Sequence, residues 1–182
     1  MSESLETKAY GSTLYLRREL LASVCAFATA GLWPIPARAA DSQKGWASCA
    51  KCRTIFFDGG PNKGRCAAGG GHSSGRTRVQ LSFNIAEGPR VQGNWRFCNK
   101  CNAVFFDGDP NKGVCPGGGG HRAQGINFML AHNIAGGGDQ FRFCAKCHAM
   151  FEAGQGRCPA GDNHAAAGFL FMLDPEGSQI MD

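Results

Sequence analysis

The segment from Trp95 to His121 reads WRFCNKCNAVFFDGDPNKGVCPGGGGH, and a close copy, WASCAKCRTIFFDGGPNKGRCAAGGGH, begins 49 residues earlier at Trp46. A third, shorter copy runs from Phe141 to His164 as FRFCAKCHAMFEAGQGRCPAGDNH. Such self-similarity is typical of folds in which one small supersecondary unit is repeated. We therefore predict three repeats, with boundaries at 45–92, 93–139 and 140–177.

Each copy carries three cysteines and one histidine in the same order. A CxxC pair is followed by a third cysteine, and the histidine comes after five further residues. The nine cysteines that follow residue 39 are an odd number, so disulfides alone cannot pair them all. Cysteine sulfur and histidine nitrogen form a tetrahedral ligand set that Zn²⁺ prefers, and a mixture of disulfides and free thiols is the alternative. The predicted ligands are Cys49, Cys52, Cys66 and His72; Cys98, Cys101, Cys115 and His121; and Cys144, Cys147, Cys158 and His164.

Four protein ligands fill the coordination shell of zinc, whereas a catalytic zinc keeps one position open for water. We therefore predict three structural Zn²⁺ sites. Each repeat is too small to bury a large apolar core, and units of this size usually need a structural metal ion or a disulfide to be stable. No nucleophile and base pair, carboxylate pair or phosphate loop recurs in the repeats, which predicts a protein that is not an enzyme.

The charge of the chain argues against bulk nucleic-acid binding. Residues 1–39 hold four basic and three acidic side chains, so 15 of the 19 basic and 11 of the 14 acidic residues remain after them. Each zinc held by three thiolates and one histidine has a formal charge of −1, and three such sites lower the remaining +4 to about +1. A protein with so little positive charge has no general attraction for phosphate backbones.

The apolar residues that follow each histidine predict β-strands. Apolar side chains lie seven and nine positions after it, as in Phe128 and Leu130 of the second copy, and a spacing of two places them on one face of a strand. We expect four short strands in each repeat and no helix. The predicted fold is all-β, with three pseudo-equivalent repeats in a β-trefoil-like arrangement, each tied by a zinc site. Three tandem zinc-ribbon-like beads are the alternative.

Residues 1–39 resemble a twin-arginine export signal. Arg17 and Arg18 precede an uncharged run, and the chain then reads Ala37-Arg38-Ala39, which is a typical cleavage pattern. Cleavage there would leave no stable membrane anchor. We therefore expect a periplasmic or secreted protein that folds around its zinc ions before export.

Two features within the repeats are candidate ligand sites. The DGxPNKG segment is ordinary turn sequence, but its carboxylate, amide and ammonium groups would also suit a hydroxyl-rich ligand. The aromatic residue that leads each repeat, such as Trp95, either packs in the core or offers a stacking surface. The candidate ligand-binding residues are Asp58, Asn62, Lys63, Asp107, Asn111, Lys112 and Trp95.

Two histidines lie outside the predicted zinc sites. His148 completes a CxxCH sequence that matches c-type haem attachment, but the same position is Arg53 and Asn102 in the other copies, so we expect zinc rather than haem here. His132 lies between the second and third copies, and we expect it to be exposed.

The pattern WxxCxKCxxxFF…GxCPxGGxH…FxL is similar to tandem cysteine-rich repeats of secreted bacterial proteins. This resemblance covers nearly all of residues 45–177 and implies a secreted setting. We expect an exported, non-enzymatic, zinc-stabilised binding module, and analogy to trefoil lectins makes carbohydrate at the cell envelope or surface the expected ligand. The alternatives are a zinc-ribbon array that binds protein or nucleic acid, and a protein for zinc storage or sensing.

Overall fold

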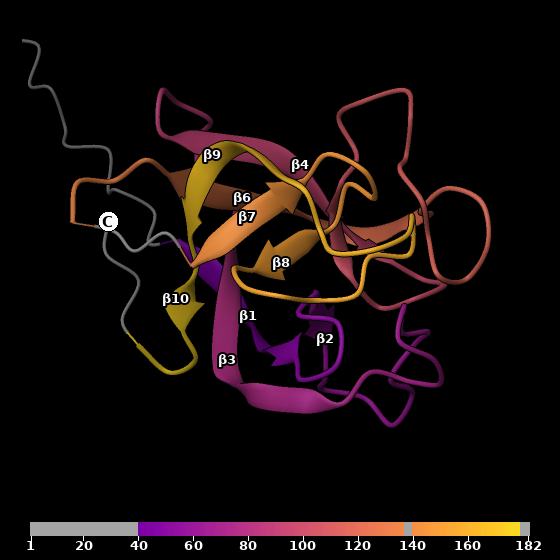
Figure 1. The fold of residues 1–182 in the computed structure, drawn as a ribbon. Coiled ribbons are helices and arrows are strands. Elements are labelled where there is room, and N and C mark those ends of the chain that lie inside the picture. The colour runs from indigo at the N-terminus through magenta and orange to yellow at the C-terminus, as the bar shows by residue number, and fades with distance from the viewer. Residues whose placement is uncertain (1–39, 137–139, 179–182) are drawn as a thin grey trace, which may run out of the picture. The chain divides into compact units, whose positions relative to one another are not determined.

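The computed structural model describes residues 40–136 and 140–178, so the predicted export signal at 1–39 lies outside the described residues. The described part is all-β, as predicted, and has ten strands and no helix (Figure 1). None of its elements is a helix long and apolar enough to cross a membrane. The strands are β1 (Asp41–Cys49), β2 (Ile55–Phe57), β3 (Ser74–Phe83), β4 (Val91–Cys98), β5 (Val104–Phe106), β6 (Ala123–His132), β7 (Phe141–Cys144), β8 (Met150–Glu152), β9 (Ala166–Met172) and β10 (Asp174–Pro175).

Each repeat folds as three antiparallel strands rather than the four that we expected. The first strand pairs with a short second strand on one side and with the third strand on the other, as β1 does with β2 and β3. The other two repeats have the same order, with β4 between β5 and β6 and with β7 between β8 and β9. The expected additional strand at CPGGGGH is absent from the described structure, because its glycines form turns.

One apolar core is shared by all three repeats. It contains the aromatic side chain that leads each repeat (Trp46, Trp95 and Phe141) and the residues on the inner faces of the third strands. Phe128 and Leu130 are among these inner residues, in agreement with the predicted spacing of two. The alternative of three separate beads is wrong, because beads would each enclose their own core.

The second strands join the three repeats into a closed ring. Phe57 N–H donates to the Asn102 carbonyl, Phe106 N–H to that of His148, and Glu152 N–H to that of Arg53, each at 2.9 Å. Repeat 1 thus bonds to repeat 2, repeat 2 to repeat 3, and repeat 3 back to repeat 1. The acceptor residues all have a left-handed backbone, with φ between 61° and 66°, which turns their carbonyls toward the preceding repeat.

The glycine that ends DGxPNKG lies at these joints. An added Cβ at Gly64 would collide with the Cys101 carbonyl, and one at Gly113 with the Cys147 carbonyl. An added Cβ at Gly156 would collide with the Cys52 carbonyl in the same way, although repeat 3 lacks the rest of the motif. Glycine is therefore needed here for close backbone approach between repeats.

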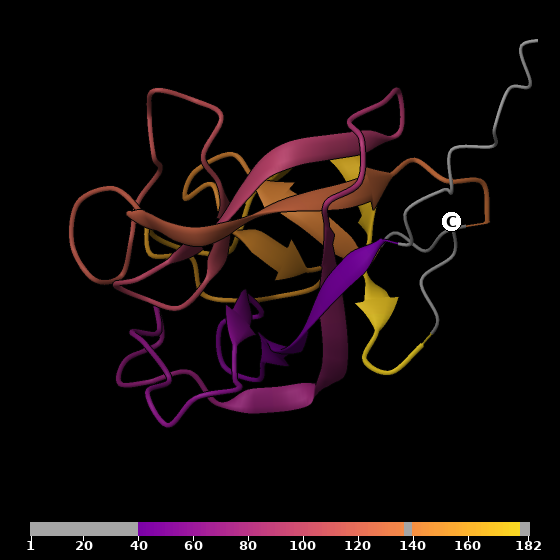
Figure 2. The same cartoon turned by 180° about the vertical axis from the view of Figure 1, so that it is seen from behind.

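The loops that carry the third cysteine and the histidine lie at one end of this unit, on the right of Figure 1 and on the left of Figure 2. Strand pairing between repeats occurs farther along the third strands. There β6 pairs with β9, and β10 pairs with β3. Strands β3 and β6 contact each other but belong to different sheets.

Candidate metal centres

The two CxxC cysteines of each site are presented by the tight turn between the first and second strands. In repeat 1, β1 ends at Cys49 and the turn closes when Arg53 N–H donates to the Cys49 carbonyl at 2.8 Å. The third cysteine and the histidine come from the glycine-rich loop. Cys66 N–H donates to the Gly70 carbonyl at 2.8 Å, which curls this loop around the Cys66 sulfur.

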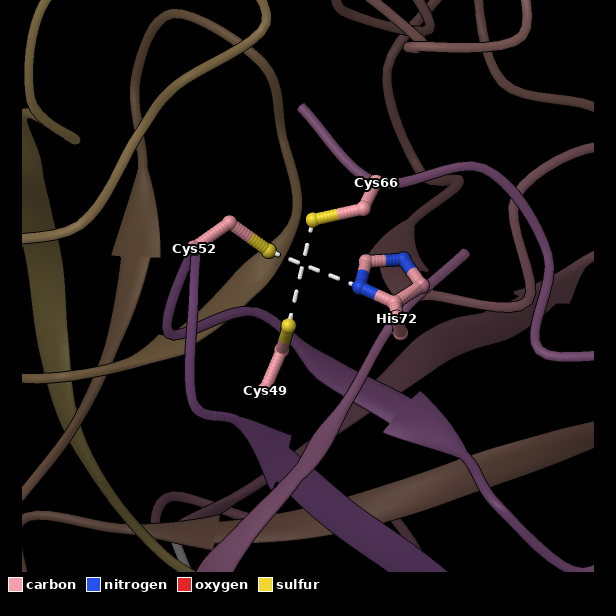
Figure 3. A group of neighbouring side chains, drawn as sticks. All are labelled: Cys49, Cys52, Cys66 and His72. Carbon is pink, nitrogen blue, oxygen red and sulfur yellow. Dashed lines mark hydrogen bonds between the residues drawn. The ribbon is translucent and has the colours of Figure 1, made fainter. Parts of the chain in front are cut away.

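The structure brings the twelve predicted ligands together in three groups of four. Within each group the four ligand atoms lie within 4.8 Å of one another, and every cysteine is buried. The side chains of the first group point toward one centre, two from the CxxC turn and two from the glycine-rich loop (Figure 3). None of the nine cysteines in the described residues forms a disulfide.

The distances between the ligand atoms fit a tetrahedral zinc ion. The first and third cysteine sulfurs are 3.9 Å apart in all three groups. The second sulfur lies 3.5 Å from Nδ1 of His72, and 3.4 Å from that of His121 and of His164. Tetrahedral zinc with ordinary bond lengths requires sulfur–sulfur edges of about 3.8 Å and sulfur–nitrogen edges of about 3.6 Å. A disulfide requires sulfurs about 2 Å apart, so the alternative with disulfides is wrong for these pairs.

The charge balance within each group also calls for a cation. Hydrogen bonds from neighbouring thiols lower the pKa of the first CxxC thiol, whereas donation to these sulfurs and burial raise the pKa of the second. The lowered thiols are Cys49, Cys98 and Cys144, and the raised thiols are Cys52, Cys101 and Cys147. Without a cation, the groups around each site therefore disfavour the deprotonation of all three thiols at once. A divalent cation at the centre removes this opposition, because it stabilises all three.

In the first and third groups the histidine is held in the tautomer that zinc requires. Nδ1 faces the sulfurs, and Nε2 of His72 donates to the Cys101 carbonyl at 3.1 Å, while Nε2 of His164 donates to the Cys52 carbonyl at 3.0 Å. Both carbonyls belong to the next repeat around the ring. Nε2 of His121 is buried without such a partner among the described residues. Contacts of this kind orient a metal-binding imidazole and raise its basicity.

A phenylalanine stacks on each of these imidazoles. The first aromatic residue of the second strand lies with its ring centre 4.6 to 4.7 Å from that of the histidine, at an interplanar angle of 19° to 20°. These pairs are Phe56 with His72, Phe105 with His121, and Phe151 with His164. These three phenylalanines therefore cover the imidazole face of each site.

The lysine inside each CxKC motif closes the outside of the site. Lys51 Nζ donates to the Gly69 carbonyl at 2.7 Å, and Lys146 Nζ to the Gly161 carbonyl at 2.6 Å. Lys100 makes the same contact with the Gly118 carbonyl. These ammonium groups fasten the glycine-rich loop and place positive charge near an anionic zinc centre. The three clusters are structural zinc sites with complete protein ligand sets, as predicted.

The polar atoms of DGxPNKG are largely used within the motif. Lys63 Nζ lies 2.7 Å from Asp58 Oδ1, and the same carboxylate accepts from Arg78 at 2.6 Å. Asn62 Oδ1 accepts from Gly64 N–H at 2.9 Å, which makes it part of the turn. In repeat 2, Lys112 pairs with Asp107 at 2.9 Å, and Asn111 Oδ1 accepts from Gly113 N–H at 3.0 Å. This bonding matches the turn interpretation of the motif.

Two predictions for individual residues are wrong. Trp95 has no exposed surface and packs among the core aromatics, so it cannot stack on an external ligand. Its Nε1 donates to Gln92 Oε1 at 3.1 Å. His132 is buried rather than exposed, and it stacks on Phe169 with ring centres 3.8 Å apart. Phe169 lies on β9, which pairs directly with β6 but is distant in the sequence, so the residues around His132 give no sign of this burial.

The structure also contains a cavity that the sequence did not indicate. It has a volume of about 560 Å³ and is lined mainly by apolar side chains from the C-terminal halves of β3 and β6, from β10 and from the linker between β3 and β4. Met129 and Met172 lie in its wall, and Asp174 contributes a carboxyl group whose pKa is raised by burial. Each strand supplies only a few residues, so no contiguous motif marks the cavity.

Comparisons with known proteins do not assign the chain to a family. No protein-family model matches it, and neither a search of curated proteins nor a search of solved structures found a match. The similarity to secreted cysteine-rich repeats therefore stays a resemblance of motifs.

Proposed function

We propose that this protein is an exported, non-enzymatic binding module that zinc stabilises, and that its ligand is carbohydrate at the cell envelope or surface. The observation that carries the proposal is the complete ligand set of each metal site. Three sulfurs and one nitrogen surround each centre, and a phenylalanine stacks on each imidazole. A zinc ion held in this way has no open position for substrate and acts as a staple.

The extracellular part of the proposal rests on the twin-arginine-like sequence at residues 1–39 and on the chemistry of the sites. Nine thiols would be exposed to oxidation outside the cytoplasm. Zinc protects them if it binds before export, because a coordinated thiolate is held within a filled shell. Cell fractionation tests this part. We expect a mature protein that begins near Ala40 outside the cytoplasm, and a full-length cytoplasmic protein would contradict it.

The two alternatives from the sequence predict other behaviour. A zinc-ribbon array for protein or nucleic acid would remain in the cytoplasm. A storage or sensing protein would exchange zinc without unfolding, but here two of the ligand histidines, His72 and His164, are bonded to neighbouring repeats. Removal of the metal should disturb these joints.

A glycan array probed with the zinc-loaded protein tests the ligand class. We expect selective retention on a subset of oligosaccharides. Equal retention of a zinc-free, unfolded sample would show that the signal is non-specific, and an array with no retained glycan would contradict carbohydrate binding.

A further inference from the structure

Two surface pockets of the same size occupy equivalent positions between repeats. Each has a volume of about 210 Å³. The 1–2 pocket lies between repeats 1 and 2 and is lined by Gln43, Phe57, Phe97, Gln124, Gly125, Ile126 and Phe128. The 2–3 pocket lies between repeats 2 and 3 and is lined by Gln92, Phe106, Asp109, Phe143, Ala167, Gly168, Phe169 and Phe171. Apart from the additional Asp109, the two linings correspond position by position in the repeats.

The aromatic walls of the two pockets have matching geometry. In the 1–2 pocket the rings of Phe57 and Phe97 lie 6.3 Å apart at 85°. In the 2–3 pocket the rings of Phe106 and Phe143 lie 6.1 Å apart at 82°. These four side chains border the core and remain partly exposed. Each pocket thus offers two nearly perpendicular aromatic surfaces, one from each repeat.

Each pocket also has a glutamine whose amide is oriented by the core. Gln43 Oε1 accepts from Trp46 Nε1, and Gln92 Oε1 accepts from Trp95 Nε1, both at 3.1 Å. Within the described part of the chain, no hydrogen bond engages Nε2 of either glutamine. The fixed oxygen leaves the Nε2 hydrogens as donors in the pocket lining. Gln124 and Asp109 add a second polar group to their respective pockets.

The remaining junction, between repeats 3 and 1, lacks this chemistry. The equivalents of the two wall phenylalanines are Glu152 and Ser48. Glu152 accepts from Thr77 Oγ1 at 2.7 Å and lies 3.2 Å from Arg53, so polar bonds fill this position. Both walls are changed together, whereas the zinc ligands are retained in all three repeats. Zinc binding and ring closure therefore do not require the paired aromatic walls.

We propose that the 1–2 and 2–3 pockets each bind one pyranose ring of an oligosaccharide. This inference rests on the proposed function, and it places the carbohydrate sites in these pockets rather than at the DGxPNKG loops. A sugar ring has an apolar C–H face that stacks on an aromatic wall, while its hydroxyl groups accept and donate hydrogen bonds at the rim. The pocket volume suits one ring, since larger organic ligands occupy roughly 300–1,000 Å³. Two equivalent pockets on one chain also allow a repetitive glycan to be held at two points, which raises avidity.

The test is a two-dimensional NMR titration of the zinc-loaded protein with cellotetraose, chitotetraose and maltotetraose. Gly125 and Gly168 lie in equivalent places in the two pockets, so their backbone amides report on each pocket separately. We expect at least one saccharide to shift both signals. The amide of Arg76, the equivalent residue at the third junction, should not shift.

Two variants with matched controls assign the site. Phe97→Ala should abolish the shift of Gly125 and keep that of Gly168, and Phe143→Ala should do the reverse, each with affinity reduced at least about tenfold at the altered pocket. Ser48→Ala at the third junction should leave both unchanged. Zinc content and the retained shift at the other pocket show that each variant is folded. Gln124→Ala, at an exposed polar position, should weaken only the 1–2 pocket.

The outcomes separate this inference from the proposed function. Saccharide-induced shifts at other residues, with Gly125 and Gly168 unmoved, would overturn the pocket assignment while carbohydrate binding stands. Unchanged shifts in both phenylalanine variants would do the same. No shift with any of the three saccharides would overturn both this inference and its carbohydrate class.

Discussion

Replacement of Gly64 by alanine tests whether the repeats are held together as a closed ring. The glycine has φ = 61°, and a Cβ built on it would collide with the Cys101 carbonyl of the next repeat. Gly70 is a matched control in the same loop. It has φ = 62°, but nothing lies within 4 Å of its added Cβ.

The two substitutions share one cost and differ in another. Alanine in a left-handed conformation costs roughly 1–2 kcal/mol, and this applies to both. Gly64→Ala must also displace the Cys101 carbonyl, which the His72 imidazole uses as an acceptor. Overpacking of this kind typically adds about 1–3 kcal/mol. We therefore expect Gly64→Ala to lower the free energy of unfolding by about 2–5 kcal/mol, and Gly70→Ala by about 1–2 kcal/mol.

The assay is urea unfolding of both variants at one fixed free zinc concentration, because bound metal contributes to stability by mass action. Repeat 2 provides an independent second comparison, between Gly113→Ala at φ = 62° and Gly119→Ala at φ = 59°. Equal losses within each pair would refute the reasoning, since they would mean that contact between repeats adds nothing to the local backbone strain.

Three further outcomes follow from the structure. Removal of zinc by a strong chelator should unfold all three repeats together, because structural zinc supplies on the order of 10 kcal/mol of folding free energy per site. Native mass spectrometry should count three zinc ions before the chelator is added. A near-ultraviolet circular dichroism spectrum that stays native after the zinc is removed would contradict this prediction. Asp58→Asn should lower stability by about 1–2 kcal/mol, and the control Asp107→Asn by less, because the Asp58 side chain is only 8% exposed and pairs with two cations, whereas that of Asp107 is 24% exposed and pairs with one. Burial opposes ionisation of Asp58, but hydrogen bonds from Lys63, Ser74 and Arg78 hold its pKa below the usual range. The contribution of Asp58 to stability is therefore complete above the usual pKa and is lost as the pH falls through the lowered pKa. A difference in stability between the wild type and Asp58→Asn that grows on acidification from pH 7 to pH 5 would be inconsistent with this sign. Asp174→Asn should raise stability at pH 8 and have less effect at pH 4.5, because burial raises the pKa of this carboxyl and its ionisation at high pH destabilises the folded state. Thermal melts at the two pH values measure the difference. A gain in stability at pH 4.5 that equals or exceeds the gain at pH 8 would contradict the prediction.

The sequence was sufficient to predict the all-β fold and the three zinc sites, because both depend on spacing along the chain. A CxxC turn and a CxxxxxH segment fix their own local geometry, and three copies distinguish a ligand from an incidental cysteine. The strand count was wrong because CPGGGGH was given a strand, although its glycines favour turns.

The joints between repeats could not be predicted, because each residue there has its role only through a neighbour in another repeat. Gly64 looks like any turn glycine until the Cys101 carbonyl is placed beside it. Strand alternation places Trp95 and Phe97 on one face, but it does not indicate that Trp95 is fully buried in the core while Phe97 lines a partly exposed pocket. The paired pockets were missed for the same reason, since the two walls of each pocket come from different repeats: Phe57 and Phe97 are 40 residues apart in the chain, and Phe106 and Phe143 are 37 apart.

Because the ring is closed, the assembly of the three repeats does not depend on which two neighbours are left without a covalent link. Repeat 3 is bonded to repeat 1 by the same backbone contact that joins the covalently linked neighbours, from Glu152 N–H to the Arg53 carbonyl. A circular permutant that opens the linker between β3 and β4 and joins Ser178 to Ala40 through a new linker should therefore assemble the same three zinc sites. Synthesis in the natural order has the opposite implication. The Cys52 carbonyl of repeat 1 lacks the bond from His164 until repeat 3 has left the ribosome, so the ring is completed only after the third repeat has been synthesised.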